Sequence, residues 1–172
     1  MKRLILIKFL LFFCIIYGQD QSDYKQSSNI KDGQSVPDFS FTDGTGKKIS
    51  MSDLKGKVVL INFFATWCGP CVQEMPYLQK DIWELLKENK NFALLSFGRG
   101  HNAEEISKFS NAKKITLPMY PDKEKIIYTS FATKYIPRNY LIDQNGIVVY
   151  SSVGFSTEEF EVLKDKINEL LK

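Results

Sequence analysis

Residues 58–71 read VVLINFFATWCGPC and combine an apolar run with a pair of cysteines. The run, residues 58–64, has the length and composition of a strand that is buried on both faces of a mostly parallel sheet. Cys68 and Cys71 follow it at the spacing Cys-x-x-Cys, which lets two thiols close a small-loop disulfide and reopen it. The cysteines therefore stand where a strand ends and a helix begins, and the sequence predicts a redox site at this junction.

The residues after the first cysteine favour a helix. Gly69 and Pro70 come first, proline is well tolerated in a first helical turn, and apolar residues at helical spacing continue to about residues 89–91. A helix N-terminus lowers the pKa of a nearby thiol, so Cys68 is expected to be the nucleophile and Cys71 the shielded, resolving cysteine. A static structural disulfide is the alternative, but so small a loop stabilises a fold little.

The first 18 residues have the pattern of a secretory signal peptide with cleavage near Gly18. A basic start precedes an almost unbroken apolar run over residues 4–17, and a polar stretch follows. An uncleaved membrane anchor is the alternative, although the run is short for a bilayer span, which takes about 20 apolar residues. Bulky residues precede Cys14, so lipidation of this cysteine is not favoured.

Removal of this leader would change two counts. Of the three cysteines only Cys68 and Cys71 would remain, so no disulfide framework competes with the motif. The leader carries three basic residues and no acidic one, so the net charge of +3 would fall to zero. Nothing in this balance favours nucleic acid or an anionic membrane surface as a partner.

The remainder is expected to be a flexible linker at residues 19–35 and one domain at residues 36–172. A turn at residues 43–46 separates two short extended stretches, which predicts an N-terminal β-hairpin. Other elements are expected as follows: strands at 92–97, 117–121, 139–143 and 147–150, and helices at 70–91, 103–112 (capped by Asn102), 124–133 and from a Thr157 cap onward. This order predicts a three-layer α/β domain with a mixed sheet, whose chemistry lies at the carboxyl ends of strands.

Four sequence blocks occur in this order along the chain: VPDF at 36–39, LKGKVVLINFFAT at 54–66, EMP at 74–76 and YIPRNYLIDQNG at 135–146. Together with the thioredoxin-like WCGPC at 67–71, they resemble the extracytoplasmic thioredoxin-like proteins of the TlpA and ResA type. The likeness covers roughly residues 36–171. It implies a thioredoxin fold in which helices flank the mixed sheet, with an N-terminal hairpin extension, and thiol–disulfide oxidoreductase activity without a cofactor.

The resemblance assigns further residues to the site. Pro137 would be a cis-proline that faces the cysteines, leaving the backbone of Ile136 free to pair with an extended partner chain. Trp67 is expected to shape the rim of the site, to pack in the core, or to do both. Gly69 and Pro70 form the dipeptide of reducing thioredoxins.

The group that accepts the proton of Cys71 is expected on the helix predicted at residues 70–91. Asn62 stands where thioredoxins place a buried aspartate that helps to deprotonate the second cysteine, so that acid is absent here. Glu74, three residues after Cys71, matches a glutamate of the TlpA and ResA group that serves a comparable role. That role requires partial burial to raise the pKa of Glu74. The alternative is an ordinary acid in the first turns of a helix.

Two other chemistries are weaker predictions. Peroxiredoxins need Pro-x-x-x-Thr-x-x-Cys, whereas Ile61 and Ala65 stand at the proline and threonine positions. Zinc takes four ligands, and besides the two thiols the chain has one histidine, His101, expected on an exposed loop with Arg99. No metal site is predicted, and a non-enzymatic Cu(I) carrier that uses the thiols is the remaining metal alternative.

The sequence therefore predicts an exported thiol–disulfide oxidoreductase of the periplasm or cell envelope that reduces protein disulfides. That compartment is oxidising, and the resemblance implies a membrane thiol-transfer protein as electron donor. Disulfide-bearing client proteins, such as apocytochromes or misoxidised envelope proteins, are the expected partners. A disulfide oxidase or isomerase is the alternative, because the residues between the cysteines are only one determinant of the redox potential.

Overall fold

The computed structural model describes residues 23–172, so the predicted signal peptide and residues 19–22 of the predicted linker lie outside the described residues. The centre is a mixed five-stranded sheet, as predicted, with strand order β5-β4-β3-β6-β7. Three strands are parallel: β3 (Val58–Phe64), β4 (Phe92–Arg99) and β5 (Met119–Asp122). Two antiparallel strands complete it: β6 (Arg138–Ile142) and β7 (Val148–Val153).

The central strand β3 is apolar because both of its faces are covered. All seven of its residues are buried. Leu60 and Phe64 pack into the core on one face of the sheet, and Ile61 and Phe63 pack into the core on the other. The alternation follows from the two-residue period of a strand, and it confirms the two-sided strand predicted at residues 58–64.

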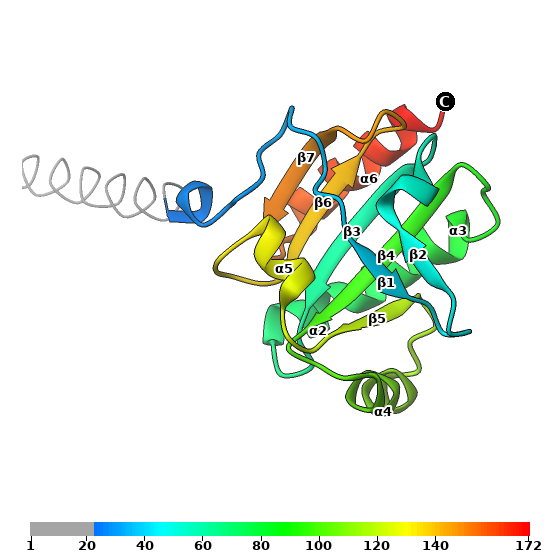
Figure 1. The fold of residues 1–172 in the computed structure, drawn as a ribbon, viewed down its shortest axis with the longest axis vertical. Coiled ribbons are helices and arrows are strands. Elements are labelled where there is room, and N and C mark those ends of the chain that lie inside the picture. Colours follow the sequence, from blue (N-terminus) through cyan, green and yellow to red (C-terminus); the bar gives the residue numbers. More distant parts are fainter. Residues whose placement is uncertain (1–22) are drawn as a thin grey trace, which may run out of the picture.

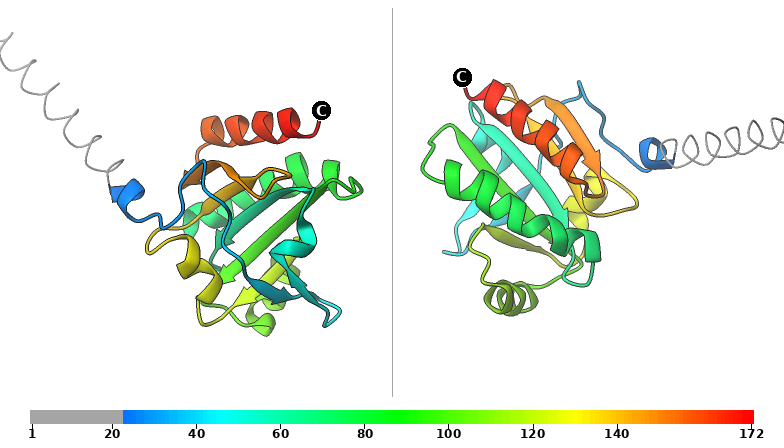
Figure 2. Two further views of the ribbon diagram at one scale, coloured as in Figure 1. Left: turned by 45° about the horizontal axis from the view of Figure 1, so that its top comes forward. Right: turned by 180° about the vertical axis from the view of Figure 1, so that it is seen from behind.

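Helices and a small hairpin cover these two faces (Figures 1 and 2). α2 (Gly69–Tyr77) and α6 (Thr157–Leu170) lie on one face. α5 (Ile126–Phe131) and the hairpin of β1 (Ser40–Thr42) and β2 (Lys48–Ser50) lie on the other, with the 3-10 helix η1 (Met51–Leu54) after the hairpin. α4 (Ala103–Lys113) lies beside the β5 edge of the sheet. The predicted three-layer arrangement and N-terminal hairpin are confirmed. No helix within residues 23–172 is long and apolar enough to cross a bilayer.

The long helix predicted at residues 70–91 is divided into three parts. α2 is followed by a π-helical segment, η2 (Leu78–Trp83), and by the short α3 (Glu84–Leu86). Pro76 lies inside α2 and has no N–H to donate to the preceding turn. The helical hydrogen bonding accordingly changes just after Pro76, where the π-helical segment begins.

Two local predictions are corrected and one is confirmed. Ser156, with an extended backbone, caps α6, and its Oγ accepts the Glu159 N–H at 3.2 Å, so the Thr157 cap was placed one residue too late. The strand predicted at residues 92–97 is two residues longer, because Gly98 and Arg99 still pair with β5. The Asn102 cap of α4 is confirmed, with its Oδ1 2.9 Å from the Glu105 N–H.

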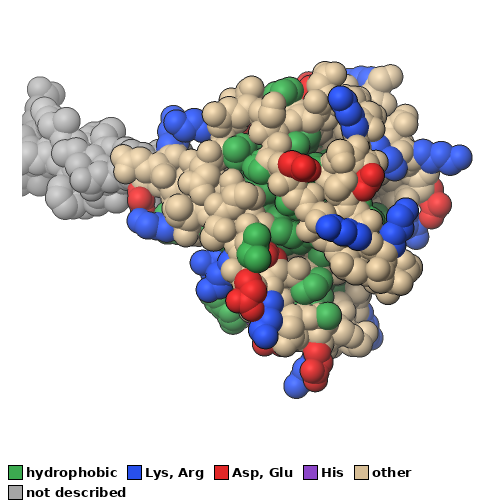
Figure 3. All heavy atoms as spheres, in the orientation of Figure 1, with side chains coloured by type: hydrophobic (Ala, Val, Ile, Leu, Met, Phe, Trp, Pro, Cys, Tyr) green, Lys and Arg blue, Asp and Glu red, His purple; other side chains and the backbone are tan. Residues whose placement is uncertain are grey.

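The predicted linker is wrong for residues 23–35, which pack on the domain. Residues 23–26 are helical, Ser28 and Ser35 form isolated bridges with Ala132 and Ile147, and Ser27 is only 2% exposed. A polar composition suggested mobility, whereas contacts with distant parts of the chain hold the segment. Figure 3 shows apolar side chains at the centre of the face that this segment crosses, where a recess is lined by Val36, Met51 and Val59 among others.

Candidate active site

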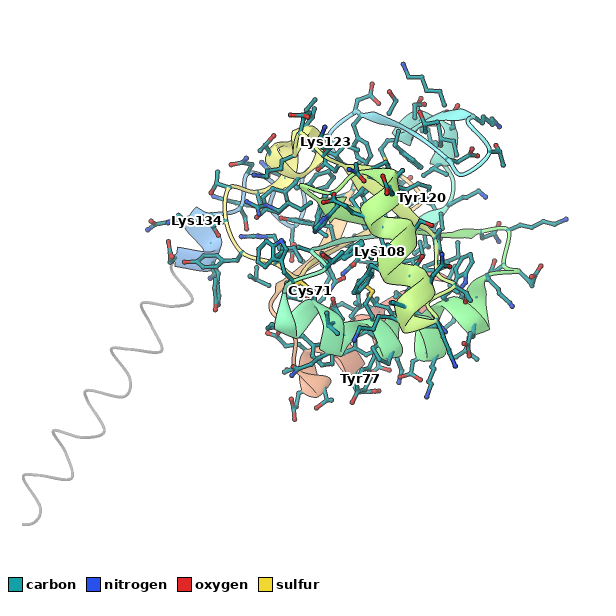
Figure 4. All side chains as sticks on the ribbon, turned by 90° about the horizontal axis from the view of Figure 1, so that it is seen from below. Cys71, Tyr77, Lys108, Tyr120, Lys123 and Lys134 are labelled. Atoms are coloured by element: carbon teal, nitrogen blue, oxygen red, sulfur yellow. A yellow bond between two sulfur atoms is a disulfide. The ribbon has the colours of Figure 1, made fainter. Side chains whose placement is uncertain are left out.

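The two cysteines are joined by a disulfide at the junction of β3 and α2, with their Cα atoms 5.3 Å apart. Cys68 is the N-cap of α2, and its Sγ lies 3.2 Å from the backbone nitrogen of Cys71. Figure 4 labels Cys71 at the start of this helix. A helix N-terminus favours negative charge, so the geometry stabilises a thiolate on Cys68 once the disulfide is reduced.

The two sulfur-bearing residues differ in accessibility. Cys68 retains 6% of its surface, and Cys71 retains none. A partner disulfide therefore reaches Cys68 first, and Cys71 lies behind it. This order of exposure is compatible with the expected roles of Cys68 as nucleophile and Cys71 as resolving cysteine.

The strand that begins with Arg138 brings a second segment to the cysteines. The Ile136–Pro137 peptide bond is cis, as the resemblance implied. The carbonyl oxygen of Ile136 lies 3.7 Å from the Sγ of Cys68. The oxidised sulfur carries no hydrogen, so this is a contact in the disulfide form, and a donor becomes available only in the thiol form. Pro137 and Ile136 are thus at the site, as expected.

Exposed residues flank Cys68 in the chain. Trp67 is 70% exposed, which decides between its two expected roles in favour of the rim of the site. Gly69 and Pro70 are also exposed, and a Cβ added at Gly69 would meet no atom within 4 Å. An exposed aromatic ring next to a reactive cysteine offers apolar surface to a docking polypeptide.

Glu74 is buried one turn after Cys71 on α2, with 1% of its surface exposed. Its Oε1 accepts a hydrogen bond from Nδ2 of Asn139 at 2.6 Å, and its Oε2 accepts one from Nδ2 of Asn62 at 3.0 Å. Residues three apart on a helix lie on the same face, so the carboxyl group and the Cys71 side chain are neighbours.

Burial raises the pKa of Glu74 from its ordinary value of 4.5 to about 7, and the hydrogen bonds from Asn139 and Asn62 oppose the rise. Near neutral pH both the protonated and the ionised carboxyl are therefore populated. This separates Glu74 from an acid that merely faces solvent in a first helical turn.

The two asparagines that hold Glu74 face each other across neighbouring strands. Asn62 of β3 is paired in register with Asn139 of β6, and Nδ2 of Asn62 also donates to Oδ1 of Asn139 at 3.0 Å. In the sequence, Asn62 was notable only for the acid that it replaces, and Asn139 was missed. The available signal was a polar residue in a short apolar strand just after Pro137.

His101 is 6% exposed, so the expectation of a solvent-exposed loop histidine is wrong. Its Nε2 accepts the backbone N–H of Thr66 at 3.1 Å, which ties it to the segment that leads into Cys68. A Cβ added at Gly98 would lie 3.3 Å from Cβ of His101 and 2.8 Å from Cδ1 of Ile106, so a glycine there makes room for the histidine. β3 and β4 are parallel neighbours, so their carboxyl ends bring Thr66 and His101 together.

Arg99, the other residue singled out on this loop, points elsewhere. Its guanidinium lies over the ring of Tyr128, 4.5 Å from the ring centroid. Within residues 23–172, no three side chains of His, Cys, Asp or Glu cluster as metal ligands would. The structure therefore brings together Cys68, Cys71, Ile136 and Pro137, with Glu74 behind them, and leaves Arg99 outside.

Comparison with known proteins bears on this constellation. The model of the AhpC/TSA family matches residues 33–151. This chain belongs to the AhpC/TSA family. Within that thioredoxin-like family it is 31% identical over 155 residues to the thiol-disulfide oxidoreductase ResA of Bacillus thuringiensis (strain Al Hakam), covering 90% of this chain and 88% of the relative. It is 34% identical over 139 residues to the thioredoxin-like protein YneN of Bacillus subtilis (strain 168), covering 81% of each.

A solved structure shows the same fold. A candidate protein disulfide isomerase from Bacteroides thetaiotaomicron superposes with a TM-score of 0.80 at 37% identity, covering 84% of this chain and 92% of that chain. The expected thioredoxin fold and the resemblance to ResA-type proteins are therefore confirmed. Like these AhpC/TSA relatives, the chain is a thiol–disulfide oxidoreductase.

Proposed function

We propose that this oxidoreductase works outside the cytoplasm as a reductant of protein disulfides, with Cys68 as nucleophile and Cys71 as resolving cysteine. The observation that carries the proposal is the arrangement of the two sulfurs. Cys68 is accessible and capped by a helix amide, whereas Cys71 is fully buried beside a carboxyl group whose pKa is about 7.

The first step is attack by the Cys68 thiolate on one sulfur of a client disulfide. A new S–S bond joins Cys68 to the client, and the other client sulfur leaves as a thiolate that takes up a proton. The site suits this step because Cys68 keeps some exposed surface, follows the exposed Trp67 in the chain and lies near the carbonyl oxygen of Ile136.

The second step releases the client. Glu74 in its ionised form accepts the proton of the Cys71 thiol, and the Cys71 thiolate attacks the Sγ of Cys68. The Cys68–Cys71 disulfide forms, and the second client sulfur leaves as a thiolate that takes up a proton, which balances the proton lost by Cys71. The client has then gained two electrons and two protons, and the protein is left in the disulfide form that the structure shows.

Location and partners belong to the same proposal. The leader-like residues 1–18 and the likeness to ResA support export to the periplasm or cell envelope. Because this compartment is oxidising, a membrane thiol-transfer protein would return the two electrons to the Cys68–Cys71 disulfide. The clients are disulfide-bearing proteins, with apocytochromes one candidate group. Peroxide reduction is not proposed, because Ala65 and Ile61 occupy the positions where peroxiredoxins need threonine and proline.

Turnover of insulin disulfides with dithiothreitol as reductant tests the chemistry. The wild type is expected to accelerate insulin reduction, and Cys68→Ser is expected to abolish the acceleration. Cys71→Ser is the matched control, because it should also lose turnover yet accumulate a mixed disulfide through Cys68. Unchanged turnover in Cys68→Ser would contradict the proposal.

A further inference from the structure

Arg138 is the largest fully buried side chain among the described residues, with 1% of its surface exposed, and it directly follows Pro137. No carboxylate is among its hydrogen-bond partners within residues 23–172. A buried cation must have its donors satisfied, because an unsatisfied one is strongly unfavourable. The partners that Arg138 uses therefore show what it holds in place.

One side of the guanidinium holds the segment before the strand, residues 134–137, here called the Pro137 loop. Nε of Arg138 donates to the carbonyl oxygens of Lys134 at 2.9 Å and Tyr135 at 3.3 Å. The Tyr128 hydroxyl also donates to the Tyr135 carbonyl, at 2.9 Å. The Pro137 loop includes Ile136, whose carbonyl oxygen lies 3.7 Å from the Cys68 sulfur.

The other side of the guanidinium holds the N-terminal clamp, defined as residues 23–28. Nη2 of Arg138 donates to Oγ of Ser27 at 2.5 Å, and Nη1 donates to Oγ of Ser28 at 2.7 Å. Both serine hydroxyls in turn donate to the carbonyl oxygen of Tyr24, at 2.8 and 3.1 Å. Each hydroxyl thus accepts from the guanidinium and donates to the backbone, so both hydrogen-bond chains are complete.

The N-terminal clamp also contacts the Pro137 loop directly. Nζ of Lys134 lies 3.5 Å from Oδ1 of Asp23, the Tyr135 hydroxyl donates to the Asp23 carboxylate, and the rings of Tyr24 and Tyr135 meet edge to face at 5.0 Å. Figure 4 shows Lys134 beside the N-terminal segment. Tyr135 itself has a left-handed backbone with φ of 69°, which a non-glycine residue keeps only where its surroundings hold it.

We propose that the N-terminal clamp acts through Arg138 as a positioning device that sets the Pro137 loop against Cys68 for the binding of a client polypeptide. The proposal rests on the proposed function, in which an extended client chain lies along Ile136 while its disulfide meets Cys68. A small displacement of the loop would then weaken client binding and alignment, since misplacement by about 1 Å is enough to slow a reaction. Arg138 and the two serines are positioning residues.

Two substrates separate positioning from a merely structural role. A disulfide-bonded peptide spans both Cys68 and the Pro137 loop, whereas dithiodipyridine is a small disulfide that needs only the Cys68 sulfur. Loss of positioning lowers kcat/KM for the peptide alone. Loss of structure lowers the reaction with both substrates.

The test compares Ser27→Ala/Ser28→Ala with Asn29→Ala in the full-length chain. Asn29 is the matched control because it neighbours the clamp and donates from Nδ2 to the Thr129 carbonyl at 2.7 Å without touching Arg138. The double variant is expected to lower kcat/KM for the peptide about tenfold, mainly through KM, and to change the dithiodipyridine rate less than about twofold. Asn29→Ala is expected to leave both rates near those of the wild type.

A double-mutant cycle extends the test. In an Arg138→Met background the two serine changes are expected to add nothing, because they act through the guanidinium. If the double serine variant does not fold, Ser28→Ala alone, which keeps the contact between Nη2 and Ser27, is expected to show a smaller loss of the same kind.

Equal peptide kinetics in the double variant and the wild type would overturn the inference, as would parallel losses with both substrates or additive effects in the cycle. A wild type that reduces neither substrate would overturn the proposed function itself, so the two failures are distinguishable.

Discussion

Asn139 and Glu74 are joined by a 2.6 Å hydrogen bond that runs from strand β6 to helix α2. The bond holds a carboxyl group that is almost fully buried one helical turn after Cys71, and the amide of Asn62 donates a second hydrogen bond to it. Two opposing effects set the pKa of Glu74 at about 7. Burial disfavours the charged carboxylate and raises the pKa, whereas the two amide donors favour the charge and lower the pKa.

Replacing Asn139 should shift this balance in a known direction. Asn139→Ala removes the donor that most lowers the pKa of Glu74, so the pKa should rise above about 7. A carboxyl-selective NMR titration of the Glu74 side chain measures it. Ser152→Ala is the control, because Ser152 meets Asn139 at 3.5 Å and does not contact the carboxyl group. A pKa that stays the same or falls in Asn139→Ala would refute this account of Glu74.

Glu74→Gln should slow the release of the mixed disulfide. In the wild type, the rate of this step should rise with pH through about 7 as Glu74 becomes ionised and able to accept the Cys71 proton. The variant should release the client more slowly and without that rise. Glu88→Gln, which changes an exposed acid in the turn after α3, should behave as the wild type. Stopped-flow measurement of mixed-disulfide release across pH tests this. Identical pH–rate profiles for Glu74→Gln and the wild type would remove Glu74 from the mechanism.

The same substitution should change how stability depends on pH. Between pH 4.5 and about 7 the folded protein keeps the Glu74 proton that the unfolded chain has lost, so folding stability falls as pH rises through this window. The fall amounts to about 3 kcal/mol at about 1.4 kcal/mol per pKa unit. Glu74→Gln should lack this fall, whatever its stability at pH 4. Parallel urea-unfolding curves for both proteins at pH 4, 6 and 8 would contradict the raised pKa.

His101→Ala should destabilise the protein at the segment that leads into Cys68. It removes the acceptor of the Thr66 N–H, and the loss of a partly buried hydrogen bond should lower the free energy of unfolding by about 1–2 kcal/mol. Lys108→Ala, an exposed residue of the neighbouring α4 (Figure 4), is the control and should leave it unchanged. Urea denaturation of the three proteins measures the effect, and equal stability of His101→Ala and the wild type would show that the contact is dispensable.

Local pattern was enough to place the cysteines, the strand before them and the helix after them. Pro137, Ile136 and Glu74 followed from a resemblance, and the structure puts all three at the site. Asn139, Arg138 and the buried state of His101 were not predicted, because each depends on a contact between segments far apart in the chain. The linker error has the same origin, since Ser27 and Ser28 are polar residues that are held by contacts with Arg138, Ala132 and Thr133, which lie far away in the sequence.

The reduction potential of the Cys68–Cys71 couple, measured in glutathione buffers, tests the central claim most directly. A protein-disulfide reductase with a Gly69-Pro70 dipeptide should have a potential near that of thioredoxin, about −270 mV. A value near about −120 mV, typical of a strong disulfide oxidant, would contradict the account and reverse the direction of electron flow.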